Sequence, residues 1–99
     1  MKTNQRVHMI VHGRVQGVFF RDSTRRTALE MDLTGMVRNL MDGSVEIFAE
    51  GPKEDLDRFV LWTHQGPPSA VVDRVDVKFE EATGQYSAFF ISYRSQAGA

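Results

Sequence analysis

The order of strand-like and helix-like segments constrains the fold of this chain most strongly. Five segments have the apolar run or the alternation of a strand: 6–12, 35–41, 45–50, 71–79 and 86–93. Two others have apolar residues at helical spacing: 20–32, and the segment from Gly51-Pro52 to the stop at Gly66-Pro67-Pro68. The predicted order is therefore strand, helix, strand, strand, helix, strand, followed by one more strand.

This order is the split βαβ pattern and predicts an α+β, ferredoxin-like sandwich, βαββαβ with an extra C-terminal strand. Both helices are expected on one face of a mostly antiparallel sheet, with the core strand order 4-1-3-2. The pattern leaves the place of the fifth strand open. Residues 1–99 are expected to form a single domain, in which 95–99 are a frayed tail of small residues.

Two local details of this fold also follow from the sequence. Asp42-Gly43 predicts a two-residue hairpin turn, because both residue types tolerate positive φ. In 71–79 the alternation places four apolar residues on the inner face and Val72 with the charged residues on the outer one. The predicted inner residues of this strand are Val71, Val75, Val77 and Phe79.

Composition excludes several classes of function. Twelve Lys and Arg against thirteen Asp and Glu give a net charge of −1, which argues against a nucleic-acid or membrane partner. The absence of cysteine excludes disulfides, thiolate metal sites and cysteine nucleophiles. The three histidines lack a helical metal-site spacing, so we expect no metal. No signal peptide and no run of roughly 20 apolar residues is present, so we expect a cytoplasmic protein. We also expect a monomer whose partner is a small molecule.

The segment between the first strand and the first helix has the residue types of an anion site. Gly13 and Gly17 allow the backbone to curl, and Arg21 follows at the expected start of the helix. Free backbone N–H groups and a guanidinium together favour a phosphate group. The nucleotide-binding loop would need Lys-Ser/Thr directly after the second glycine, where Val18-Phe19 stand.

The predicted anion is therefore small and needs no magnesium. The expected binding residues are those of the loop itself: Arg14, Val15, Gln16, Gly17, Val18 and Phe19. For Arg14 an alternative is a side chain that simply faces solvent. Arg21, whose planar fork can hold two phosphate oxygens at once, has the same alternative.

Asn39 is the second candidate, because asparagine is disfavoured inside a strand. Its amide either supports the turn that follows or holds a water molecule for attack. His12 borders the loop and either contacts the phosphate or packs at the strand end. Trp62 is expected to pack against Phe59 rather than to bind a ligand.

Two motifs resemble the signatures of the acylphosphatase family. Val11-x-Gly13-x-Val15-Gln16-Gly17-Val18-x-Phe20-Arg21 resembles the first, and Gly35-x-Val37-Arg38-Asn39-x-x-x-Gly43-x-Val45 followed by Gly51 resembles the second. The family usually has an aromatic residue where Met36 stands. The resemblance implies that Arg21 binds the phosphate, that Asn39 positions the attacking water, and that an acyl phosphate is hydrolysed without metal or cofactor.

Two other functions compete with hydrolysis. Ferredoxin-like domains also serve as non-catalytic ligand-binding modules, and the fold alone does not decide between them. RNA-recognition domains share the topology, but residues 44–50 lack their basic-Gly-aromatic pattern and contain two glutamates.

Overall fold

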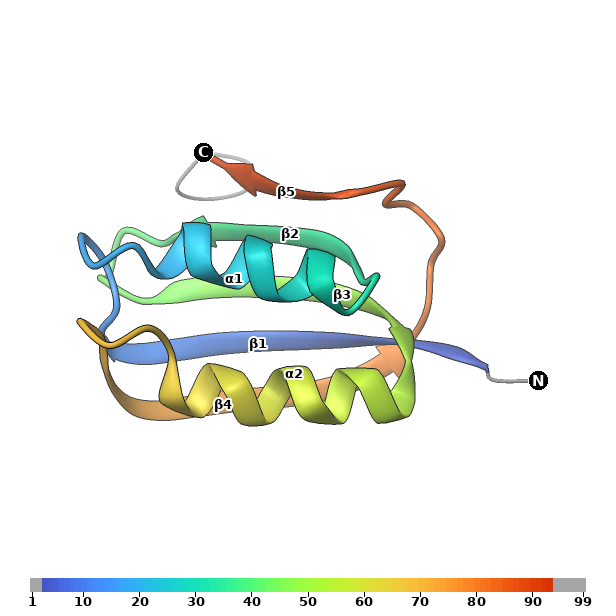
Figure 1. The fold of residues 1–99 in the computed structure, drawn as a ribbon, viewed down its shortest axis with the longest axis horizontal. Coiled ribbons are helices and arrows are strands. Elements are labelled where there is room, and N and C mark those ends of the chain that lie inside the picture. Colours follow the sequence, from blue (N-terminus) through green and yellow to red (C-terminus); the bar gives the residue numbers. More distant parts are fainter. Residues whose placement is uncertain (1–2, 94–99) are drawn as a thin grey trace.

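The computed structural model describes residues 3–93, and Figure 1 shows the fold. The elements in chain order are β1 (Asn4–Arg14), α1 (Phe20–Glu30), β2 (Thr34–Asn39), β3 (Val45–Pro52), α2 (Lys53–Gln65), β4 (Val71–Glu81) and β5 (Phe89–Ser92). Both helices lie side by side on one face of a single sheet (Figure 1), which confirms the predicted α+β sandwich. The expected tail at 95–99 lies outside the described residues.

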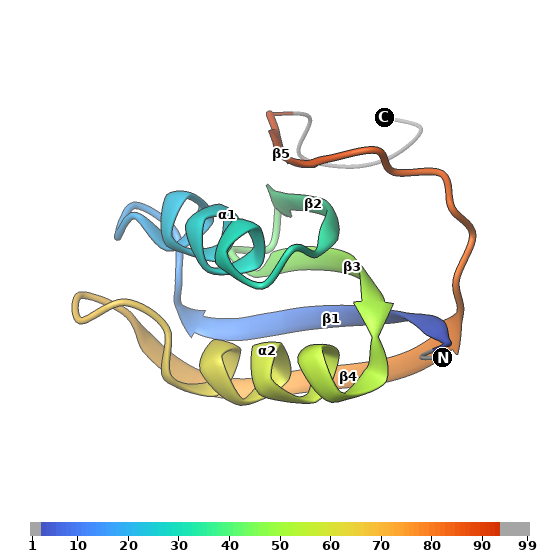
Figure 2. The same ribbon diagram turned by 45° about the vertical axis from the view of Figure 1, so that its right-hand side comes forward.

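The sheet has five strands in the order β4-β1-β3-β2-β5. β1 pairs antiparallel with β3 and β4, and β2 pairs antiparallel with β3. The predicted core order 4-1-3-2 is confirmed. β5, which the sequence leaves unplaced, runs parallel to β2 at the edge, with Gly35 opposite Phe89. Figure 2 shows the long connection from β4 to β5 passing along one end of the sheet.

The core lies between the helices and the sheet. The helices contribute Phe20, Thr24, Ala28, Leu56, Phe59 and Thr63, all with no more than 1% of their surface exposed. β3 contributes Val45, Ile47 and Ala49, and β1 contributes Val7, Met9 and Val11, all fully buried. Trp62 packs against the rings of Phe20 and Phe59 at centroid distances of 5.8 and 6.3 Å, as expected for a packing residue.

The predicted inner face of β4 is wrong at its first two residues. Val71 is 58% exposed, whereas Val72 packs against the core. The cause is a β-bulge: His12 pairs with Arg74 but Gly13 pairs with Val72, which leaves Asp73 as an extra residue on β4. An extra residue reverses the in–out alternation beyond it, so Val75 and Val72 both face inward.

The predicted two-residue turn at Asp42-Gly43 is also wrong. The N–H of Gly43 donates to the carbonyl of Leu40 at 3.2 Å, and the N–H of Leu40 to the carbonyl of Ser44 at 2.8 Å. Three residues, 41–43, therefore form the loop, and of these Gly43 alone has positive φ. The carboxylate of Asp42 accepts the N–H of Ser44 at 2.9 Å, a local hydrogen bond that favours this wider turn.

α1 ends in a Schellman motif that has aspartate in the place usual for glycine. The N–H of Leu33 donates to the carbonyl of Ala28 at 2.9 Å, and that of Asp32 to the carbonyl of Leu29 at 3.1 Å. Asp32 has φ 56°, the left-handed conformation that costs free energy for a residue with a Cβ atom.

Asp32→Gly is expected to raise the free energy of unfolding by about 0.5–1 kcal/mol, because glycine adopts this conformation without strain. Urea denaturation of the two proteins measures the difference. Glu30→Gly, which introduces glycine at the last helical residue, is the matched control and should destabilise the protein. A loss of stability in both variants would contradict the strain at Asp32.

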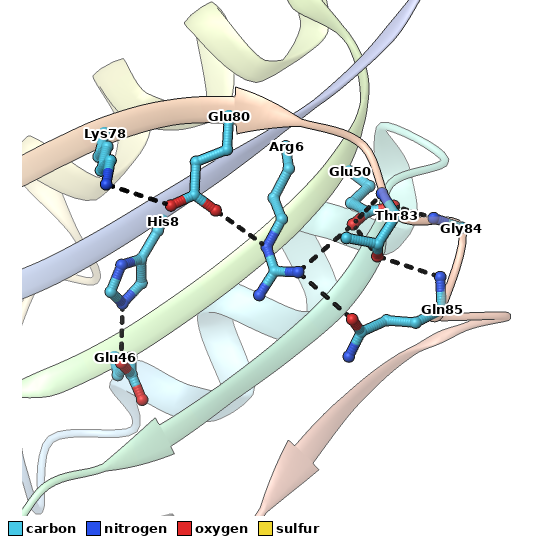
Figure 3. A network of polar contacts seen from close by, with 9 residues as sticks. All are labelled: Arg6, His8, Glu46, Glu50, Lys78, Glu80, Thr83, Gly84 and Gln85. Atoms are coloured by element: carbon cyan, nitrogen blue, oxygen red, sulfur yellow. Dashed lines mark hydrogen bonds and ion pairs between the residues drawn. The ribbon is translucent and has the colours of Figure 1, made fainter.

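The sheet face away from the helices carries a polar network rather than open charges (Figure 3). Glu50 of β3 is only 4% exposed. Its carboxylate accepts the hydroxyl of Thr83 at 2.6 Å, the N–H of Thr83 at 3.0 Å and the N–H of Gly84 at 2.9 Å. Arg6 lies 3.9 Å from the same carboxylate. The connection to β5 is therefore tied to the centre of the sheet.

These contacts set the pKa of Glu50. Burial alone would raise the pKa, but the hydrogen bonds from Thr83 and Gly84, together with Arg6, outweigh burial and lower it. Because the pKa is lower in the folded state, the carboxylate stabilises the fold above the pKa of the unfolded chain, about 4.3. This contribution is lost as the pH falls through the folded-state pKa.

Glu50→Gln should therefore cost about 1–3 kcal/mol of stability at pH 7, because one of the two oxygen acceptors becomes a donor. The difference between the variant and the parent protein should shrink as the pH falls from 5 towards 3. Urea denaturation across this pH range measures it. Glu30→Gln removes an exposed carboxylate and should show no such trend; the same trend in both variants would contradict the assignment.

Candidate active site

A pocket of about 260 Å³ opens where the loop between β1 and α1 meets the ends of β2 and β5. Its lining residues are Val15, Gly17, Phe19, Phe20, Arg21, Asp22, Asn39, Ile91 and Tyr93. The two residues expected to carry the chemistry, Arg21 and Asn39, thus lie in one pocket although they belong to different elements. Of the six predicted loop residues, Val15, Gly17 and Phe19 line this pocket.

The other three loop residues lie elsewhere. Arg14 is the exposed last residue of β1. Val18 is 6% exposed and belongs to the hydrophobic core. The side-chain amide of Gln16 donates to the carbonyls of Leu40 and Ser44, at 2.8 and 2.9 Å. Gln16 therefore joins this loop to the turn between β2 and β3, and its side-chain NH2 group is occupied by these two hydrogen bonds.

The two glycines of the loop have different structural roles. Gly13 has φ +132°, and a Cβ atom there would lie 2.2 Å from the carbonyl oxygen of Val71. Glycine is therefore required for the close approach of β1 to β4 at the bulge. Gly17 has φ +73° with open space around it, so its backbone conformation alone favours glycine.

Arg21 lies in the first turn of α1. Two residues before it is Phe19, the N-cap residue, which has a left-handed backbone conformation. Phe19 has φ 62° and ψ 23°, and its carbonyl accepts the N–H of Ser23 at 3.0 Å. The guanidinium carbon of Arg21 lies 5.1 Å from the ring centroid of Tyr93, a cation–π contact. The side chain is half-buried rather than extended into solvent.

Asn39 is the last residue of β2 and is half-buried. Its Oδ1 atom is buried and accepts no hydrogen bond from any residue within 3–93. A buried polar atom without a partner costs free energy, and such atoms in native structures usually serve a ligand or water. The amide does not support the following turn, which Gln16 and Asp42 hold instead.

His12 does not contribute to this pocket. Its Nε2 atom lies 2.9 Å from the carboxylate of Asp76 and 3.1 Å from the guanidinium of Arg74, between β1 and β4. The hydrogen bond from His12 is the largest of the interactions that lower the pKa of Asp76. The structure thus favours the alternative in which His12 packs at the strand end.

Four lining residues were not among the expected site residues, and one of them, Phe20, also belongs to the hydrophobic core. Ile91 lies in β5 and Tyr93 directly follows this strand, whose place in the sheet the sequence pattern does not predict. Asp22, an exposed residue of the first turn of α1, adds a carboxylate to the rim.

Within residues 3–93, no three His, Asp or Glu side chains gather as a metal ion would require. Neither described helix is long and apolar enough to cross a membrane.

The fold and this pocket together define a ferredoxin-like domain with a pocket that brings Arg21 and Asn39 together at the ends of β2 and β5. The acylphosphatase family model matches residues 7–91. An acylphosphatase of Pelotomaculum thermopropionicum is 46% identical over 88 residues, which cover 89% of this chain and 96% of that protein.

Solved structures agree with the sequence relatives. An acylphosphatase from Bacillus subtilis superposes with a TM-score of 0.87 at 38% identity, covering 90% of this chain and 99% of that chain. An acylphosphatase from Coxiella burnetii gives 0.85 at 40% identity, covering 91% and 94%. The chain belongs to the acylphosphatase family and is an enzyme that hydrolyses acyl phosphates.

Gln16→Ala is expected to reduce the free energy of unfolding by about 1–2 kcal/mol, because the carbonyls of Leu40 and Ser44 lose their donor. Urea denaturation measures the loss. The matched control is Gln65→Ala, at the exposed C-terminal residue of α2. If both variants were equally stable, the link between loop and turn would contribute nothing.

Proposed function

We propose that the chain hydrolyses acyl phosphates by attack of a water molecule held by Asn39 on a phosphate bound by Arg21 and the loop backbone. The observation that supports this best is the shared pocket, in which a guanidinium lies with a buried amide oxygen that has no hydrogen-bond partner among residues 3–93. The pocket needs no further charged group for the chemistry that such a substrate requires.

An acyl phosphate is a mixed anhydride, and its leaving group is a carboxylate whose conjugate acid has a pKa of about 4. A carboxylate departs without being protonated, so the enzyme needs no general acid. Phosphoryl transfer depends mainly on holding the equatorial phosphate oxygens and aligning the nucleophile in line. The planar guanidinium of Arg21 and N–H groups of residues 14–19 perform the first task.

Asn39 performs the second task. Its Oδ1 atom accepts a hydrogen bond from the attacking water, which turns the lone pair of the water towards phosphorus. The P–O bond to the carboxylate breaks as the new P–O bond forms, and a phosphate oxygen of the substrate takes the proton of the water. This route is favoured because the ring of His12 is held by Asp76 and Arg74 away from the pocket.

Replacing either residue tests the proposal. Arg21→Gln should lower turnover of benzoyl phosphate by roughly 10²–10³ and weaken inhibition by inorganic phosphate, because it removes a charged donor to the phosphate. Asn39→Ala should lower kcat by a similar factor while phosphate inhibition stays nearly unchanged. The assay is run with EDTA present, and Arg25→Gln, an exposed position on α1, is the control.

Wild-type turnover in either site variant would contradict the assigned roles. Phosphate binding by the parent protein without any turnover would instead favour a non-catalytic module of the same fold.

A further inference from the structure

We propose that Phe19 and Tyr93 bind the acyl part of the substrate and select aromatic acyl phosphates over small aliphatic ones. This inference rests on the proposed function of the same pocket. An acyl phosphate has two chemically different parts, an anionic phosphate and a carbon skeleton. Arg21 and Asn39 serve the first, and the two aromatic rings lie beside them on the pocket lining.

Both rings are unusually exposed. Phe19 is 76% exposed and Tyr93 is 79% exposed, although each lines a concave site. They come from separate elements, the loop before α1 and the residue after β5, and half-buried Ile91 adds apolar surface between pocket and sheet. Exposed apolar surface that gathers at a pocket is typical of ligand binding, whereas isolated exposed side chains are not informative.

Stability does not explain the phenyl ring of Phe19. The residue has left-handed backbone angles, which are costly for a bulky side chain, and its ring gains little from burial. The helix start needs only the carbonyl of this residue, which accepts the N–H of Ser23. Glycine would meet both backbone requirements without strain, so the ring must be explained by something that it contacts.

The ring of Tyr93 lies next to the group that binds phosphate. The 5.1 Å contact with the Arg21 guanidinium places the ring beside the group that binds the phosphate in the proposed reaction. Aromatic rings attract one another at centroid separations of about 4.5–7 Å, so a flat aromatic acyl group gains a contact with such exposed rings. An acetyl group has no ring to make this contact. The substrate class is therefore an aromatic carboxylic–phosphoric anhydride.

The test compares benzoyl phosphate with acetyl phosphate, which carry the same phosphate on different acyl groups. We expect the ratio of their kcat/KM values to fall about three- to tenfold in Phe19→Ala and in Tyr93→Ala, mainly through KM for benzoyl phosphate. Inhibition by inorganic phosphate, which has no acyl group, should change much less. Leu61→Ala, a 71% exposed side chain on α2, is the matched control and should leave the ratio unchanged.

Three further variants separate the effect of the rings from backbone strain and from the phenol hydroxyl of Tyr93. Phe19→Gly relieves the left-handed strain, so it should be more stable than the parent protein and still lose the preference. Asp32→Gly changes the backbone in the same way outside the pocket and should retain the preference. Tyr93→Phe keeps the ring and should also retain it.

An unchanged ratio in both alanine variants would overturn the proposal. So would equal losses on the two substrates together with weaker phosphate inhibition, since that result would make Tyr93 a positioning residue for Arg21. If the parent protein hydrolyses neither substrate, the proposed function itself fails, and this inference falls with it.

Discussion

Two hydrogen bonds from one side chain bring the halves of the active site together. The amide of Gln16 extends from the loop that leads into α1 and donates to Leu40 and Ser44, on either side of the turn after β2. Arg21 follows that loop, and Asn39 directly precedes that turn. A residue that does not line the pocket therefore ties together the two segments that carry the guanidinium and the amide. Because a small change in geometry strongly affects phosphoryl transfer, the proposed chemistry depends on this link.

The part of the pocket formed by Ile91 and Tyr93 depends on a contact on the sheet face away from the helices. β5 is short, pairs with β2 alone among the strands of residues 3–93, and is reached by a long connection (Figure 2). Glu50 holds the start of that connection through Thr83 and Gly84, and the N–H of Gly35 donates to the carbonyl of Ala88 at its end. Between these two attachments the chain passes along one end of the sheet (Figure 2). It then continues into β5, and Ile91 and Tyr93 line the pocket. A buried carboxylate on the sheet face away from the helices thus holds the connection that leads to this side of the pocket.

Periodicity predicted both helices, the four core strands and most of the buried residues, because each of these depends on short-range spacing. The family signatures predicted Arg21 and Asn39, which the structure places in one pocket. The features that escaped prediction are those set by distant partners. The inward turn of Val72 follows from a bulge opposite Gly13, and the burial of Glu50 follows from Thr83. The presence of Tyr93 in the pocket was not predicted, because the place of a fifth strand depends on which edge of the sheet is free.

The two left-handed residues that bound α1 limit how the length of this chain can vary. Phe19 and Asp32 each reverse the backbone at one helix end, and the buried side chains between them follow a single stripe from Phe20 to Ala28. One inserted residue in this interval would rotate everything beyond it by about 100°, so either Arg21 or the stripe would lose its orientation. Insertions and deletions are therefore not tolerable between the two ends of this helix.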